Sequence, residues 1–129
     1  MNHILIVEDE DFLIRVLQDN LATESFTTDV ARDGYEAMDK IRRDRPALVL
    51  LDLLLPKKDG FEVLEEIKKN PDLKLIPVIV LSNLGGDADL KRALSLGADD
   101  YFVKSQHPIT EVVEKVKEYM EGGKAVKPR

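Results

Sequence analysis

Five short apolar runs rich in β-branched residues recur along the chain, separated by longer segments whose apolar residues follow helical spacing. The runs cover residues 3–8, 26–31, 47–52, 77–82 and 99–103. They begin 23, 21, 30 and 22 residues apart, which leaves room for a strand, a loop, a helix and a return loop. The first, third and fourth runs are apolar almost throughout, as expected of strands that are covered on both faces of a sheet.

The segments between these runs predict five helices, because their apolar residues recur at intervals of three and four. The predicted buried stripes are Phe12, Leu13, Val16, Leu17 and Leu21; Ala37, Met38 and Ile41; Phe61, Leu64 and Ile67; Leu90, Ala93 and Leu94; and Ile109, Val112, Val113, Val116, Tyr119 and Met120. Gly97 is expected to cap the fourth helix, and Pro108 to open the fifth. A strict alternation of strand and helix implies an α/β fold, a five-stranded parallel sheet flanked by helices.

The length of 129 residues predicts one domain, which we place at residues 1–121. Gly122 and Gly123 are expected to end the last helix, so residues 122–129 are predicted to form a flexible C-terminal tail. Stretches long and apolar enough to span a bilayer are missing from the sequence, and its first residues lack the pattern of a secretory signal. We therefore expect a cytoplasmic location and no membrane partner.

Charge and cysteine content exclude several classes of function. The formal net charge is −6, which argues against direct DNA binding because nonspecific nucleic-acid binding needs a basic face. The chain has no cysteine, so disulfides, thiolate catalysis and cysteine zinc sites are excluded. The two histidines, His3 and His107, show no ligand spacing and are interpreted as incidental.

Acidic residues follow two of the predicted strands. Glu8 and Asp9 close the first run, and Asp52 closes the third. Because the carboxyl ends of parallel strands share one edge of the sheet, these carboxylates are expected to meet there. They would repel one another unless a cation lay between them, and Mg²⁺ prefers such oxygen ligands. The pattern predicts a Mg²⁺ site beside one reactive carboxylate.

Ser82 closes the fourth run and Lys104 closes the fifth. Each alone is better explained as a locally satisfied hydroxyl or a solvated charge. Their coincidence with the acidic residues at neighbouring strand ends changes that interpretation. Together the set predicts that Asp52 attacks a phosphoryl group and forms an acyl phosphate, while Lys104 and Ser82 bind phosphoryl oxygens.

The chain resembles a response regulator receiver domain of two-component signalling, of the chemotaxis single-domain type. The resemblance rests on ILIVEDE, LVLLDLLLPKKDGFEVL, PVIVLS and GADDYFVK in that order, and runs from about Ile4 to Met120. It implies a doubly wound, flavodoxin-like (βα)5 fold with strand order 2-1-3-4-5. It also implies that Asp52 is the phosphoacceptor, Asp9 a metal ligand and Glu8 a metal partner that acts through water.

The resemblance assigns further positions. The backbone carbonyl of Leu54 matches a third metal ligand, and Lys104 and Ser82 match the lysine and the switch hydroxyl of the family. Tyr101 matches the switch aromatic, which moves inward when the hydroxyl is drawn to the phosphoryl group. Pro56 and Gly60 match the loop after the phosphoacceptor, where Gly60 is expected to relieve a turn with positive φ.

Three departures from the family pattern stand out. Ser105 replaces the proline that usually follows Lys104 and often has a cis bond, so the isomer of the Lys104–Ser105 bond stays open. Asn83 replaces a very small residue and is expected to narrow access to the site. Leu54 and Leu84 occupy the positions where the family varies phosphoryl lifetime, and apolar side chains there predict a long-lived acyl phosphate, because they do not orient an attacking water.

The resulting hypothesis is a phosphorelay switch. A histidine kinase or phosphotransfer protein phosphorylates Asp52 in a Mg²⁺-dependent reaction, which changes the face formed by the fourth helix, fifth strand and fifth helix for an output partner. Phosphorylation is expected to promote dimerisation through the face of the fifth helix. The domain is expected to catalyse only its own phosphorylation and slow autodephosphorylation, without being a metabolic enzyme. The alternatives are a non-phosphorylated pseudo-receiver scaffold, a flavodoxin-like FMN binder and an aspartyl phosphatase.

Overall fold

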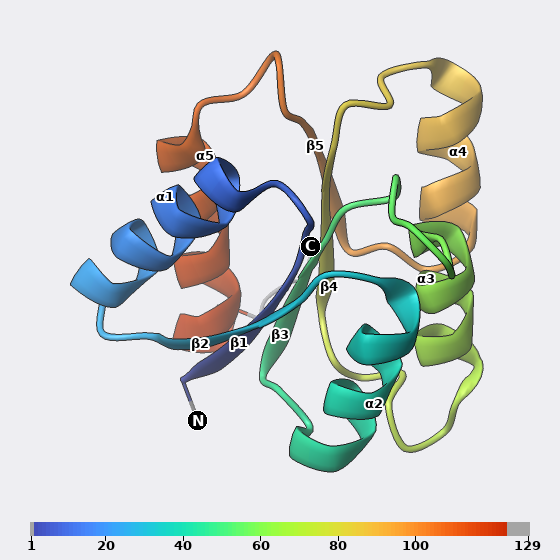
Figure 1. The fold of residues 1–129 in the computed structure, drawn as a ribbon, viewed down its shortest axis with the longest axis horizontal. Helices are drawn as coiled ribbons and strands as arrows, with labels where there is room; N and C mark the ends of the chain where they lie inside the picture. The colour runs from blue at the N-terminus through green and yellow to red at the C-terminus, as the bar shows by residue number, and fades with distance from the viewer. Residues whose placement is uncertain (1, 124–129) are drawn as a thin grey trace.

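The computed structural model describes residues 2–123, which form one parallel five-stranded sheet with helices on both faces (Figure 1). The strand order is β2-β1-β3-β4-β5, which confirms the order implied by the family resemblance. The strands are β1 (His3–Val7), β2 (Thr27–Ala31), β3 (Leu48–Leu51), β4 (Val78–Ser82) and β5 (Asp100–Val103). The helices are α1 (Asp11–Thr23), α2 (Gly34–Asp44), α3 (Gly60–Lys69), α4 (Asp87–Ser95) and α5 (Ile109–Glu118), followed by a π-helical turn over Tyr119–Gly123.

Alternating side chains of the central strands pack into two separate hydrophobic cores, one on each face of the sheet. Leu5 and Val7 of β1 pack on the face covered by α2, α3 and α4, whereas Ile4 and Ile6 pack on the face covered by α1 and α5. Figure 1 shows the same division, with α1 and α5 on one side of the sheet and the other three helices opposite. This double cover is why the central strands are apolar on both faces.

Two residues of the predicted buried stripes lie on the surface. Phe12 is 80% exposed, and the buried residues of α1 are Ile14, Leu17 and Leu21. Residues 14, 17 and 21 share one face at 3.6 residues per turn, and Phe12 lies on nearly the opposite side of the helix. Leu94 of α4 is also exposed. The prediction that these two side chains are buried is therefore wrong.

The start of α3 differs from expectation in its backbone. Asp59 and Glu62 form a reciprocal capping box, and Gly60 is the first helical residue rather than part of a turn with positive φ. Lys57, with φ 69°, adopts the left-handed conformation in this loop. Glycine is required at position 60 because an added Cβ would lie 2.3 Å from the carbonyl oxygen of Asp52. Glycine is therefore needed here because of this close contact, and the expected positive φ at Gly60 was wrong.

The helix ends after α4 and before α5 agree with the sequence signals. Gly97 follows α4 with φ 109°, a conformation that glycine adopts without a Cβ clash. Pro108 precedes the first residue of α5. Of the predicted tail, Gly122 and Gly123 complete the π-helical turn, and residues 124–129 lie outside the described part of the chain. Among residues 2–123 there is no helix long and apolar enough to cross a bilayer.

Candidate metal and phosphoacceptor site

The acidic residues that follow β1 and β3 meet at the carboxyl edge of the sheet. These two strands are direct neighbours, with Val7 opposite Leu51. The backbone N–H of Asp52 donates to the carbonyl of Val7 at 3.0 Å, which continues the pairing one residue past the end of β3. One carboxylate oxygen from each of Glu8, Asp9 and Asp52 lies within 4.8 Å of the other two. The structure thus brings together the three side chains proposed as a metal-binding group.

Lys104 reaches the same group from the end of β5. Its Nζ lies 3.0 Å from Oε1 of Glu8 and 3.0 Å from Oδ2 of Asp52. It also lies 3.2 Å from Oε1 of Glu10, a contact that the sequence analysis did not foresee. The backbone N–H of Lys104 donates to the carbonyl of Ser82 at 2.8 Å, which fixes this residue beside the end of β4. The lysine is therefore the central cation of an acidic cluster.

Burial of the carboxyl groups in this cluster shifts the pKa values of Glu8 and Lys104. Glu8 is 2% exposed and Asp52 is 4% exposed. Burial, together with the negative charge of Asp52, raises the pKa of Glu8 to about 7, although the bond from Lys104 opposes the rise. Burial lowers the pKa of Lys104, but the charges of Asp52 and Glu8 outweigh this effect and raise it above the usual value. The ammonium is held charged because it neutralises two buried carboxyl groups.

An open pocket of about 160 Å³ gives access to the phosphoacceptor candidate. Its lining residues are Asp9, Glu10, Asp52, Leu54, Asn83 and Lys104. The backbone N–H of Leu54 donates to Oδ1 of Asp52 at 3.1 Å, and the Leu54 side chain is 54% exposed at the pocket rim. Asn83 also lies on this lining.

Ser82, Leu84 and Tyr101 form a connected set beside the pocket. Ser82 is fully buried, and its Oγ accepts a long hydrogen bond of 3.4 Å from the backbone N–H of Leu84. The Tyr101 hydroxyl donates to the backbone carbonyl of Leu84, which lies in the loop between β4 and α4. The Leu84 side chain packs against the core on the α2–α3–α4 face and does not line the pocket. Of the two lifetime positions, only Leu54 thus borders Asp52.

Two features near Lys104 were left open or missed by sequence reasoning. The Lys104–Ser105 peptide bond is trans. His107, interpreted as incidental, accepts a hydrogen bond at Nδ1 from the backbone N–H of Val103 and packs edge-on against Phe102. It thereby supports the end of β5 immediately before Lys104. The sequence around His107 carries no motif that would have predicted these contacts.

The chain matches the family model described as response regulator receiver domain over residues 4–117. It is 42% identical to the response regulator Rcp1 of Synechocystis sp., over 81% of this chain and 77% of that protein. It is 40% identical to the probable methanogenesis regulatory protein FilR2 of Methanothrix harundinacea, over 92% of this chain and 83% of that protein. It is also 40% identical to the probable transcriptional regulator ycf27 of Guillardia theta, but there it spans only 40% of the relative.

Solved structures give the same result. The Mn²⁺-bound form of the response regulator Rcp1 superposes with a TM-score of 0.84 at 37% identity, covering 93% of this chain and 94% of that one. The phosphorylated cyanobacterial phytochrome response regulator RcpA superposes with a TM-score of 0.82 at 39% identity, covering 98% and 96%. With the family model covering nearly the whole chain and an acidic pocket at the expected sheet edge, this chain belongs to the family of response regulator receiver domains.

Proposed function

We propose that the chain accepts a phosphoryl group on Asp52 from the phosphohistidine of a kinase or phosphotransfer protein, in a Mg²⁺-dependent reaction. The observation that carries this proposal is the contact between Lys104 Nζ and Oδ2 of Asp52, 3.0 Å long, in a pocket that opens to solvent. A nearly buried carboxylate with a fixed ammonium partner is oriented for attack on a phosphoryl group.

The donor set fits a hard divalent cation. Glu8, Asp9 and Asp52 supply carboxylate oxygens close to one another, and Asp9 is exposed at the pocket mouth. We assign direct ligation to Asp9, Asp52 and the backbone carbonyl of Leu54, with Glu8 acting through water. Mg²⁺ bound by these groups would offset the negative charge that gathers on the phosphoryl oxygens. The similarity to Rcp1, solved with Mn²⁺, supports a divalent metal at such a site.

The transfer step is a displacement at phosphorus. An oxygen of the Asp52 carboxylate forms the new bond to phosphorus, while the bond from phosphorus to the donor's histidine nitrogen breaks. The electron pair of that bond stays on the imidazole nitrogen. The product on this chain is an acyl phosphate, and the similarity to the phosphorylated response regulator RcpA supports this assignment.

The neighbouring side chains have separate roles in this proposal. Lys104 is already within hydrogen-bond distance of Asp52 and would pair with a phosphoryl oxygen after transfer. Ser82 would turn its hydroxyl toward another phosphoryl oxygen and give up its long contact with the N–H of Leu84. Because Tyr101 is bonded to the carbonyl of the same Leu84, this movement would reach the β4–α4 loop and the aromatic ring together.

The output would be a change of the face formed by α4, β5 and α5. Phosphorylation biases an existing equilibrium between two arrangements of this face, toward the one that binds an output partner or a second copy of the chain. The proposed chemistry is limited to the domain's own phosphorylation and slow dephosphorylation, because the pocket offers Leu54 where an acid or amide would orient water.

Intact mass after incubation with acetyl phosphate and Mg²⁺ tests the proposal. The wild type should gain the mass of one phosphoryl group, and Asp52→Ala should gain none. Omission of Mg²⁺ or its removal with a chelator should abolish the gain. Asp59→Ala is a matched control, because Asp59 caps α3 a few residues away and lies outside the pocket. A folded wild type that binds Mg²⁺ but gains no phosphoryl group would contradict the proposal and favour the non-phosphorylated scaffold.

A further inference from the structure

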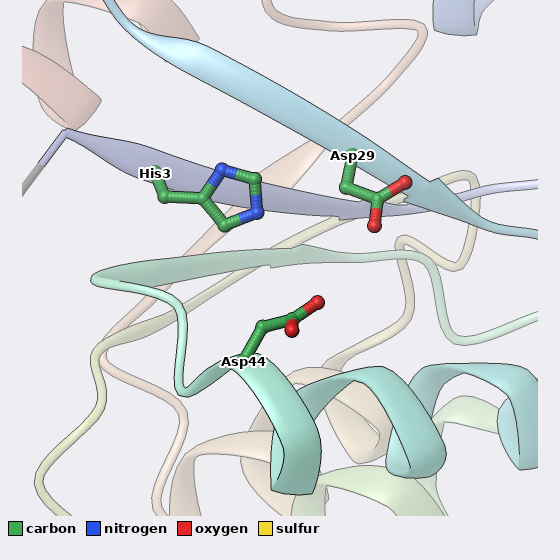
Figure 2. Close-up of side chains that lie close together, drawn as sticks. All are labelled: His3, Asp29 and Asp44. Atoms are coloured by element: carbon green, nitrogen blue, oxygen red, sulfur yellow. The ribbon is translucent and has the colours of Figure 1, made fainter.

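A second cluster of potential metal ligands lies outside the pocket at Asp52. It consists of His3 at the start of β1, Asp29 in β2 and Asp44 at the end of α2. One donor atom from each lies within 4.8 Å of the other two. Figure 2 shows the imidazole and both carboxylates converging on the space between the two strands and the end of the helix. This group combines a nitrogen donor with two carboxylates, unlike the all-carboxylate group at the opposite edge.

The fold explains why residues so distant in sequence meet here. His3 is opposite Thr27 in the parallel register, and Asp29 follows two residues later on the same face of β2. Leu5 and Ala31, which continue the same two rows of side chains, pack under α2. His3 and Asp29 therefore project toward α2, and this helix ends at Asp44 beside them. The N–H of Ala47 donates to the carbonyl of His3 at 2.8 Å, which ties the chain after α2 to β1.

The imidazole of His3 is oriented as metal-binding histidines usually are. Its Nδ1 is hydrogen-bonded to Oγ1 of Thr27 at 3.0 Å. The other ring nitrogen faces the carboxylates of Asp29 and Asp44 (Figure 2). A hydrogen bond at one ring nitrogen fixes the ring plane and tautomer, and thereby prepares the other nitrogen as a ligand.

Both carboxylates are held in place by neighbouring donors. Burial of Asp29 acts to raise its pKa, but hydrogen bonds from the N–H of Val30 and from Lys40 lower it overall. These bonds fall on Oδ1, at 2.8 and 3.2 Å. The bond from Arg43 lowers the pKa of Asp44. Arg43 donates to both carboxylate oxygens of Asp44, at 3.1 Å to Oδ1 and 3.0 Å to Oδ2. An incoming cation must displace this exposed ion pair and the contact of Lys40 with Oδ1 of Asp29.

We propose that His3, Asp29 and Asp44 form a second divalent-metal site that selects a Zn²⁺-like ion over Mg²⁺. An imidazole nitrogen favours Zn²⁺ and its transition-metal neighbours, whereas Mg²⁺ prefers oxygen ligands alone. Three protein ligands and one water complete a tetrahedral shell at about 2.0–2.1 Å per ligand. The donor atoms must move closer together than they are in the present structure. Rotation of the exposed Asp44 side chain supplies this movement.

Occupation of this site would cross-link β1, β2 and α2. An ion that binds the folded chain alone stabilises it in proportion to the logarithm of its concentration over Kd. The site lies near the amino end of β1, and Glu8 of the phosphoacceptor pocket follows the carboxyl end of the same strand. The two sites are therefore separated by the length of β1 and by their ligand chemistry, and each can be filled independently.

The test is a titration of the untagged full chain with Zn²⁺ and with Co²⁺, in excess Mg²⁺ to occupy the phosphoacceptor pocket. We expect one equivalent of Co²⁺ to give the visible absorption of a four-coordinate ion, and Zn²⁺ to displace it. Asp44→Asn should raise Kd for Zn²⁺ at least about 10-fold, as should Asp29→Asn. His3→Gln should abolish the Co²⁺ absorption. Zn²⁺ should also raise the Tm of the wild type and leave that of His3→Gln unchanged.

Matched controls make the outcome decisive. Asp39→Asn removes an exposed carboxylate from the same helix, and His107→Gln removes the other histidine. Both should bind Zn²⁺ like the wild type. The proposal is overturned if Zn²⁺ binding survives His3→Gln and Asp44→Asn, or if only Asp9→Asn removes it, since the ion would then occupy the phosphoacceptor pocket. Failure of the wild type to bind Zn²⁺ would overturn it equally. Asp44 is exposed, so its variant should fold even if His3→Gln does not.

Discussion

The hydroxyl of Tyr101 donates a hydrogen bond to the backbone carbonyl of Leu84, and so joins β5 to the loop that follows β4. Leu84 also donates its N–H to Oγ of Ser82. One loop residue therefore contacts both the hydroxyl beside the pocket and the aromatic residue of β5. In the proposed function, a shift of Ser82 toward a phosphoryl group and a rearrangement of Tyr101 are parts of one movement.

Tyr101→Phe removes this hydrogen bond and retains the ring. We expect the free energy of unfolding to fall by about 1 kcal/mol, the usual contribution of one such bond. We also expect the amides of residues 82–85 to show increased exchange broadening, because the loop loses its tether. Urea unfolding and relaxation dispersion provide the two measurements. Tyr35→Phe, at an exposed position on α2, is the control. Unchanged exchange in the loop would show that the bond does not restrain it.

Lys104→Met removes the cation that neutralises Glu8 and Asp52. Both carboxyl groups are nearly buried, so at pH 8 without metal the variant should lose roughly 3 kcal/mol of stability. Mg²⁺ should restore most of this loss, because it supplies the missing positive charge. Thermal unfolding with and without Mg²⁺ measures both effects. Lys115→Met, which removes a partly exposed lysine of α5, should lose little. A variant as stable as the wild type without metal would contradict the proposed role of Lys104 as counter-ion.

Glu8 predicts an unusual pH dependence for the metal-free protein. Its pKa is about 7 in the folded state, against an ordinary value of 4.5, so between these values the folded chain binds up to one more proton than the unfolded chain. Stability from this group is fully present below pH 4.5 and is lost as the pH rises through 7, by roughly 3 kcal/mol.

Glu8→Gln should remove this decline, because glutamine does not titrate. The measurement is the free energy of unfolding from pH 5 to pH 8, in buffers free of divalent metal. Mg²⁺ should flatten the wild-type curve, since it favours the ionised carboxylate. An equal decline in wild type and variant would assign the pH dependence to another group.

Leu54→Asn tests the predicted long phosphoryl lifetime. Leu54 is the apolar residue on the pocket lining next to Asp52, and an amide there would orient a water toward phosphorus. We expect phosphate loss at least about tenfold faster in the variant than in the wild type. Leu84→Met is the control, because the Leu84 side chain packs on the core away from the pocket. A wild type that already loses phosphate as fast as Leu54→Asn would refute the prediction.

The candidate site was predictable wherever strand topology alone brings residues together. Glu8 and Asp52 end neighbouring parallel strands, so their meeting follows from sheet order and requires no knowledge of side-chain rotamers. The contact of Glu10 with Lys104 was not predictable in this way, because it depends on how the chain enters α1 and where a long side chain extends. A carboxylate at a helix start is already explained by its favourable interaction with the helix dipole. This explanation gave no reason to expect that Glu10 also contacts Lys104.

The burial of Phe12 was mispredicted for a different reason, the phase of its helix. Phe12 was assigned to the buried stripe on its apolar character, but the phase of the helix is set by Ile14, Leu17 and Leu21. The cluster around His3 depends on strand register and on the length of α2, and neither is encoded in a short motif. Local patterns thus predicted which elements form, whereas contacts between elements required their three-dimensional arrangement.

The close approach of α3 to Asp52, the proposed phosphoacceptor, also limits where movement can occur. With its first residue directly against the carbonyl of Asp52, the helix leaves no space for a Cβ at position 60. The backbone at the start of α3 has no room to move toward Asp52 if this carboxylate acquires a bulky, charged substituent. Under the proposed function, displacement would be directed away from α3, toward the opposite wall of the pocket, so reporter groups belong in the β4–α4 loop rather than at the start of this helix.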